Sequence, residues 1–163
     1  MICGTRGCAR ILTAGGGGVR KSGILADVTD EAANMYERVG GEATFRALVH
    51  EFYRGVATDP LLRPLYPEED LGPAEERLAL FLIQYWGGPH TYSEQRGHPR
   101  LRMRHAPFRV DALARDRWLF HMRAAMEVVG AQGVMSQKDA EEVWAYMESA
   151  AQFMVNAGDP LEA

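Results

Sequence analysis

The strongest pattern in the chain is a run of apolar residues between positions 45 and 56 that recur at intervals of three and four. This spacing places them on one face of an α-helix, so the pattern predicts an amphipathic helix with one buried side. The helix is expected to stop at Asp59-Pro60, because proline lacks the backbone N–H that would continue it. The apolar face comprises Phe45, Leu48, Val49, Phe52, Tyr53 and Val56.

Three further segments show the same periodicity and predict helices at 73–86, 111–130 and 136–157. Each begins with a residue that is typical of helix N-termini, namely Pro73, Asp111 and Ser136. Their inward faces are expected to comprise Ala74, Leu78, Phe81, Leu82 and Tyr85 in the first helix, Ala114, Trp118, Met122, Ala125, Met126 and Val129 in the second, and Ala140, Val143, Trp144, Met147, Ala151 and Met154 in the third.

The remaining segments are shorter. Thr29 and Asp30 are expected to cap a short helix that ends at Gly40-Gly41. Between 89 and 111 the chain is rich in loop residues and leaves room for one or two helical turns around His105. No segment alternates apolar and polar residues in the manner of a β-strand, and no repeat of fixed period occurs. The fold class predicted is therefore all-α.

Length and composition fit a single soluble globular domain. The chain has 163 residues, of which 47% are hydrophobic and 25% charged, and these are ordinary values. Its net charge of -4 argues against a nucleic-acid partner. No apolar run is long enough to span a bilayer, so no transmembrane segment is expected. The two cysteines, Cys3 and Cys8, lie so close to each other and to the chain end that a disulfide between them would not stabilise the fold. The lack of a structural disulfide favours a reducing compartment and a cytoplasmic location.

Residues 1–34 differ in composition from the rest of the chain. They contain four consecutive glycines at 15–18 and no acidic residue before Asp27. This glycine density favours disorder, because glycine loses more conformational entropy on ordering than any other residue. The glycine run resembles a phosphate-binding loop, but Arg20 stands where that loop needs glycine. We expect a disordered extension at 1–34, or a true translation start at Val28 or Met35, then a folded domain at 35–157 and a tail at 158–163.

Positions 98–108 combine cations, apolar residues and one imidazole. Three arginines alternate with two apolar residues directly before His105, and Pro107 and Phe108 end the segment. An iron porphyrin requires this combination, because a neutral imidazole nitrogen ligates the iron and nearby cations pair the two propionates. A histidine beside a proline is, by itself, also typical of a capping or surface residue.

Two residues with polar atoms are expected on buried helix faces. Tyr53 lies within the apolar stripe of its helix and Trp118 faces inward, so the phenol hydroxyl and the indole N–H both need partners. A plain helical bundle, in which both side chains are merely packed, is the alternative. Together with the arginine-rich segment before His105, these two residues favour a cavity with polar groups at its rim.

The other histidines offer no metal site. Neither His-Glu-x-x-His nor Glu-x-x-His occurs, and these are the helical spacings that hold zinc or a di-iron pair. His50 is expected at the surface, and His90 and His98 lie in loops. His121, three residues after Trp118, is expected to be a hydrogen-bonded group of the core.

Several longer motifs stand out. They are Gly40-Gly41, Phe52-Tyr53, Tyr66-Pro67-Glu68, Glu75-Glu76-Arg77-Leu78, Gln84-Tyr85-Trp86-Gly87-Gly88-Pro89, the run from Thr91 to Phe108, and Asp116-x-Trp118. A chain with these motifs resembles a truncated haemoglobin of the second group, the actinobacterial O type. The resemblance extends from about Met35 to Asn156 and leaves the first 34 residues outside.

The resemblance implies a globin-like two-over-two helical sandwich around haem b, with His105 as the proximal iron ligand. Ala74 then occupies the distal position, and Trp118 and Tyr66 donate hydrogen bonds to bound oxygen, with Tyr53 behind them. The other cofactor contacts implied are Leu78, Phe81, Tyr92, Arg96, Arg102, Arg104, Phe108 and Met122. Of these, Tyr92 and the three arginines are candidates for the propionates.

The function implied is tight oxygen binding, because two donors aimed at partly charged oxygen slow its release. Oxygen would then take part in redox chemistry with nitric oxide or peroxide, with Tyr53 and Tyr66 as electron donors, or be held without catalysis for storage or sensing. O2, NO, CO and peroxide are the small ligands expected. The chain has no flavin or nicotinamide motif, so turnover would require a separate reductase. The oligomeric state stays open, with a homo-oligomer as one alternative.

Overall fold

The computed structural model describes residues 33–158, and all regular structure in that range is helical. The all-α class is confirmed. The elements are α1 (Met35–Arg38), α2 (Glu42–Thr58), the 3₁₀ helix η1 (Arg63–Leu65), α3 (Gly72–Tyr85), α4 (Thr91–Arg96), α5 (Leu101–His105), α6 (Ala112–Gly130) and α7 (Gln137–Met154). The extension predicted at 1–34 lies outside the described residues except for its last two positions, as does most of the tail predicted at 158–163.

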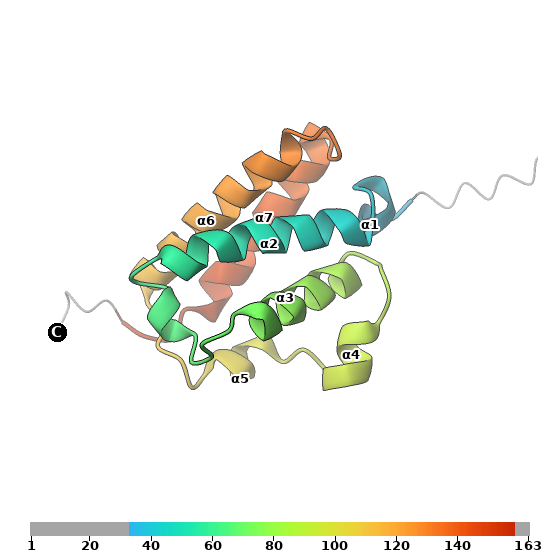
Figure 1. The fold of residues 1–163 in the computed structure, drawn as a ribbon. Helices are drawn as coiled ribbons and strands as arrows, with labels where there is room; N and C mark the ends of the chain where they lie inside the picture. The colour runs from blue at the N-terminus through green and yellow to red at the C-terminus, as the bar shows by residue number, and fades with distance from the viewer. Residues whose placement is uncertain (1–32, 159–163) are drawn as a thin grey trace, which may run out of the picture. The chain divides into compact units, whose positions relative to one another are not determined.

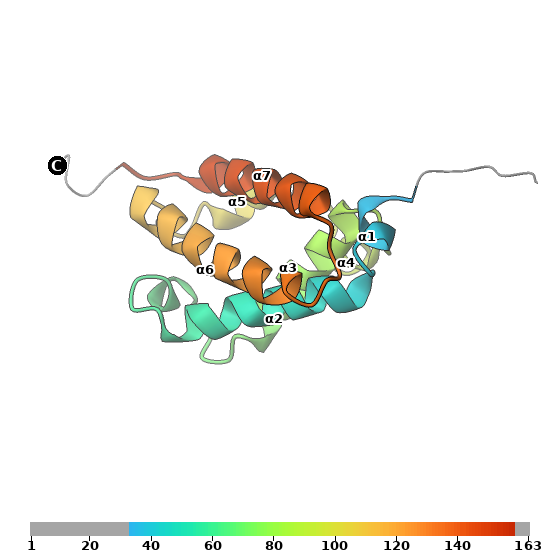
Figure 2. The ribbon, with the colours of Figure 1, turned by 90° about the horizontal axis from the view of Figure 1, so that it is seen from above.

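Two antiparallel helix pairs make up the fold (Figure 1). Helices α2 and α3 form one pair, α6 and α7 form the other, and α2 packs across α6. Figure 2 shows the pairs from above, with α5 beside α7 and α4 near the end of α3. The two-over-two arrangement expected from the sequence is thus confirmed.

The helix caps explain where several elements begin. Asp111 caps α6 by accepting a hydrogen bond from the backbone N–H of Ala114, and Ser136 caps α7 by accepting one from Asp139. Both caps were expected. Helix α1 is capped by Asn34, which forms a capping box with Glu37. Thr29 and Asp30, the caps predicted for this helix, lie outside the described residues.

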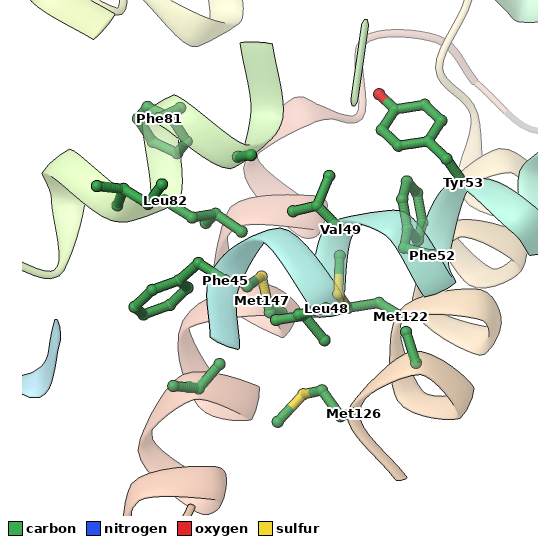
Figure 3. Close-up of a cluster of buried hydrophobic side chains, with 14 of the residues drawn as sticks. Phe45, Leu48, Val49, Phe52, Tyr53, Phe81, Leu82, Met122, Met126 and Met147 are labelled. Carbon is green, nitrogen blue, oxygen red and sulfur yellow. The ribbon is translucent and has the colours of Figure 1, made fainter. Parts of the chain in front are cut away.

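The core is formed largely by the apolar face of α2 (Figure 3). All six residues predicted for this face are buried. Methionines from α6 and α7 and side chains from α3 pack against it, so that four helices share one core. The labelled residues that show this are Met122, Met126, Met147, Phe81 and Leu82.

Two aromatic residues predicted to face inward are not fully buried. Tyr85 is 50% exposed and stacks on Tyr146 of α7, with ring centroids 4.0 Å apart. It lies at the end of α3, where α7 covers only one side of it. Trp144 is half-buried: it packs against the core, and the Arg123 guanidinium lies 3.6 Å from the centre of its ring.

Helix α4 was not predicted, because six residues are too few to show a helical period. Its attachment to α3 is specific: the Gln84 amide donates to the Ser93 hydroxyl at 2.7 Å and accepts from the Ser93 backbone N–H at 2.9 Å. Gly97, with φ 71°, ends the helix in a conformation that suits glycine. Within residues 33–158, no helix combines the length and apolar character needed to cross a membrane.

Candidate functional site

The geometry of His105 is set by its own short helix. Its Nδ1 lies 2.8 Å from the carbonyl oxygen of Leu101, one turn earlier. A carbonyl can only accept, so Nδ1 carries the hydrogen of this bond. In a neutral imidazole, Nε2 then bears a lone pair and can ligate a metal. Asn156, which follows α7, also fixes this segment, because its side-chain amide donates to the carbonyls of His105 and Phe108.

His105 lines a cavity of about 590 Å³, which is within the usual size range of small-molecule sites. Eleven of the predicted site residues contribute to its lining, and most of the surrounding side chains are apolar. These eleven are Tyr53, Tyr66, Ala74, Leu78, Phe81, Tyr92, Arg96, Arg104, His105, Phe108 and Trp118.

The other two predicted cofactor contacts do not reach the cavity lining. Met122 is completely buried in the core between α2 and α6. The Arg102 guanidinium lies 5.3 Å from the centre of the Phe153 ring, on the outer side of α5 and α7. Alternation along 100–104 could not decide which arginine faces the cavity, because a short helix turns successive side chains by about 100° rather than 180°.

Three aromatic residues with polar atoms line the same cavity as His105. Tyr53 and Tyr66 pack edge to face with ring centroids 5.6 Å apart, and Trp118 packs on Phe52 at 5.0 Å. Figure 3 shows the Tyr53 hydroxyl extending beyond the apolar cluster. Burial raises the pKa of Tyr53, and the neighbouring Tyr66 raises it further. Burial likewise raises the pKa of Tyr66, so both phenols keep their O–H donors at neutral pH.

The Arg63 side chain fixes the backbone at Tyr66 and just after it. Arg63 donates from Nη1 to the carbonyl of Tyr66 at 3.0 Å and from Nη2 to the carbonyls of Glu68 and Glu69, each at 2.9 Å. These bonds occupy both terminal nitrogens of the guanidinium. They close the connection between η1 and α3 into a fixed loop and place Tyr66 at the cavity edge.

Sequence reasoning did not single out Arg77, although it lines the cavity. It lies one helical turn after Ala74, and its guanidinium pairs with the Glu68 carboxylate at 2.9 Å. Hydrogen bonds from the backbone N–H of Glu68 and from Arg77 hold the pKa of Glu68 below its usual value. The i+3 spacing from Ala74 is the sequence feature that could have revealed Arg77.

The segment that carries His105 is strongly basic, and two of its arginines, Arg96 and Arg104, line the cavity. Residues 96–109 contain five arginines and no acidic residue. Two of the five also donate to the backbone: Arg104 to the carbonyls of Pro99 at 2.8 Å and of Arg96 at 2.7 Å, and Arg109 to that of Gly158 at 3.1 Å. Arg100 starts α5 in the left-handed region, with φ 41°. This edge of the cavity can therefore attract anionic groups.

The remaining histidines lie as expected from the sequence. His50 is exposed and contacts Glu75 at 3.0 Å. His121 is hydrogen-bonded in the interior, with Nε2 2.7 Å from a carboxylate oxygen of Asp59. Among the described residues, no group of three or more histidine, cysteine or acidic side chains is arranged to hold a metal ion.

The chain is similar to several characterised haem proteins in sequence and in fold. The family of bacterial-like globins matches residues 34–156. Group 2 truncated haemoglobin YjbI of Bacillus subtilis is 41% identical over 121 residues, which cover 74% of this chain and 87% of that protein.

Solved structures give the same result. A thermostable haemoglobin from the actinobacterium Thermobifida fusca is 60% identical, with a TM-score of 0.73 and coverage of 77% of this chain and 98% of that one. A truncated oxygen-avid haemoglobin from Bacillus subtilis is 40% identical, with a TM-score of 0.70 and coverage of 76% and 100%. The likeness therefore extends over nearly the full length of those two proteins and about three quarters of this chain.

Proposed function

The chain belongs to the bacterial-like globins, as a truncated haemoglobin of the second group, and on that premise we propose that it binds oxygen tightly at a haem b group held by His105. Haem binding and small gaseous ligands are expected throughout this family. The observation that carries the proposal is the bond from His105 Nδ1 to the Leu101 carbonyl, which leaves the Nε2 lone pair able to ligate a metal in a residue that lines the cavity.

The residues around the cavity fit a haem group in three respects. His105 would supply a nitrogen ligand to the iron through Nε2, and among the described residues no group of three or more metal-ligating side chains competes with it. Apolar side chains such as Leu78, Phe81 and Phe108 provide surfaces for the macrocycle. Cationic side chains at the rim can pair the propionates. The candidates are Arg77, Arg96 and Arg104, together with the Tyr92 hydroxyl and, from outside the lining, Arg102.

Other residues of the cavity lining are expected to supply hydrogen-bond donors for the ligand. When bound, haem supplies an iron that takes up oxygen and draws partial negative charge onto it. The Ala74 side chain has no hydrogen-bond donor and is too small to block the ligand. Hydrogen bonding to the ligand is therefore left to Trp118 and Tyr66, with Tyr53 behind them. Donors held in a largely apolar site stabilise such charge better than water does. The similar truncated haemoglobin of Bacillus subtilis is oxygen-avid, which supports this arrangement for the present chain.

A second candidate function is redox chemistry at the haem. Bound oxygen would react with nitric oxide, or the protein would reduce peroxide, and a separate reductase would return the electrons to the iron. It is favoured by the buried Tyr53–Tyr66 pair, because phenols beside the cavity can donate electrons. Mixing the oxygenated protein with nitric oxide and measuring nitrate in a single turnover tests this candidate. Stoichiometric nitrate supports it, whereas absence of both nitrate and peroxide reactivity leaves storage or sensing.

Replacement of the proposed ligand tests the main proposal. His105→Ala should abolish stoichiometric haem retention and change the absorption spectra of the reduced protein under air and under carbon monoxide. The matched control is His98→Ala, which removes an exposed histidine from the same segment and should leave both spectra unchanged. Full haem content and an unaltered Soret band in His105→Ala would contradict the assignment.

A further inference from the structure

A completely buried carboxylate, Asp59, lies at the end of α2 outside the cavity. A buried charge is costly unless it is fully hydrogen-bonded, and here four groups share that role. One carboxylate oxygen accepts the backbone N–H groups of Leu61 at 2.8 Å and Leu62 at 2.9 Å. The other accepts Arg117 Nε at 2.9 Å, Arg117 Nη2, and His121 Nε2 at 2.7 Å.

These bonds join the two parts of the chain that carry the proposed oxygen donors. On one side, Asp59 fixes the start of the segment that leads to Tyr66. On the other side, Arg117 directly precedes Trp118 on α6, and His121 follows it by three residues. The carboxylate thus connects the backbone before Tyr66 to the turn of α6 that presents the indole.

The approach of His121 to Asp59 depends on a glycine. Gly55 of α2 lies under the imidazole, and a Cβ added there would stand 2.3 Å from Nδ1 of His121. Any larger residue would push the ring away from Asp59. The contact therefore requires glycine on α2 for reasons of space, since the backbone of α2 is regular at this position.

The charge on Asp59 makes the arrangement rigid. Burial alone would raise the pKa of Asp59, but the hydrogen bonds from His121, the Leu62 N–H and Arg117 outweigh burial and hold the pKa below its usual value. The carboxylate is therefore ionised at neutral pH. If α6 rotated or slid, Asp59 would lose two of its partners while still buried, and that penalty opposes the motion.

We propose that Asp59, Arg117 and His121 are positioning residues for oxygen binding, because they fix the turn of α6 that aims the Trp118 indole N–H at the ligand. The proposal rests on the function proposed above. In this proposal, residues outside the cavity align a donor that lies inside it. Packing of α6 on α2 alone would not require a cluster of buried ions.

The test uses His121→Leu in the haem-loaded protein, with His121→Gln as a conservative variant that keeps an N–H donor. The readouts are the oxygen dissociation rate and the C–O stretching frequency of the carbon monoxide complex, which responds to donors near the ligand. His121→Leu should accelerate dissociation about fivefold, corresponding to about 1 kcal/mol, and shift the C–O frequency. His121→Gln should restore both values toward those of the parent protein.

Two controls separate alignment from stability. Val129→Ala creates a cavity in the buried face of α6 away from Trp118, so it should lower the melting temperature without moving the C–O frequency. In a Trp118→Phe background, His121→Leu should cause no further acceleration, because the donor it aligns is already absent. An equal acceleration in both backgrounds would overturn the proposal.

If His121→Leu does not fold, Arg117→Gln provides the same test. The Arg117 side chain is half-buried, and this substitution removes its guanidinium, which is the other α6 donor to Asp59. Should Trp118→Phe alone leave oxygen dissociation unchanged, the proposed role of Trp118 and this inference both fail. Acceleration by Trp118→Phe, together with no effect of either His121→Leu or Arg117→Gln, refutes the positioning role alone and leaves the proposed function intact.

Discussion

Replacement of Trp118 by phenylalanine isolates one hydrogen bond. The variant keeps an aromatic ring against Phe52, whose centroid lies 5.0 Å away, and deletes the indole N–H. A hydrogen bond to a charged acceptor contributes about 1.5–3 kcal/mol. Its loss should accelerate oxygen dissociation roughly 10-fold to 150-fold, since each 1.36 kcal/mol corresponds to about tenfold in rate. The bond forms only after the ligand arrives, so the association rate should change much less.

The assay is stopped-flow displacement of oxygen by carbon monoxide from the reduced, oxygenated protein. Trp144→Phe is the matched control, because this residue is also half-buried but lies beneath Arg123 away from the cavity. Tyr66→Phe, alone and combined with Trp118→Phe, shows how the two donors share the ligand. Equal dissociation rates for Trp118→Phe and the parent protein would show that the indole only packs, and would refute the reasoning.

Two further predictions concern the cluster around Asp59. Gly55→Ala should lower the melting temperature and displace His121, because the added Cβ would stand 2.3 Å from the imidazole. Thermal unfolding and the chemical shifts of the imidazole measure these two effects. Unchanged values would contradict the close contact between Gly55 and His121. Because its folded-state pKa is lowered, Asp59 stabilises the protein above its unfolded pKa of about 4, and this contribution is lost as pH falls through the folded value. The difference in unfolding free energy between the parent protein and Asp59→Asn should therefore be present at neutral pH and shrink below about pH 4, and a difference that stays constant would argue against an ionised Asp59.

Prediction from the sequence worked where the structure depends on nearby residues. The α2 face was correct at all six positions, because helical spacing alone determines which side chains share a face. Asp111 and Ser136 were identified as caps, since a cap bonds to a backbone N–H within three residues. The placement of His105 on a short helix was also correct.

Prediction failed where the structure depends on distant residues. Tyr85 follows the α3 stripe yet is 50% exposed, because it is the last residue of α3 and Tyr146 of α7 stacks on its ring without covering the rest of it. Asp59 was interpreted only as part of the signal that ends α2, but it is a buried ion that meets side chains 58 and 62 positions later. Nothing within a few residues of Asp59 indicates those partners.

The family motifs and helical periods in the sequence were enough to determine the fold class, the main helices and the histidine at the cavity, because each depends on spacing along the chain. Tertiary structure alone decided that Arg77 and Arg104 line the cavity while Arg102 does not, and that Asp59 connects α2 to α6. The physical reason is that the energy of a charge depends on burial and on partners in space, and both are set only when the helices pack.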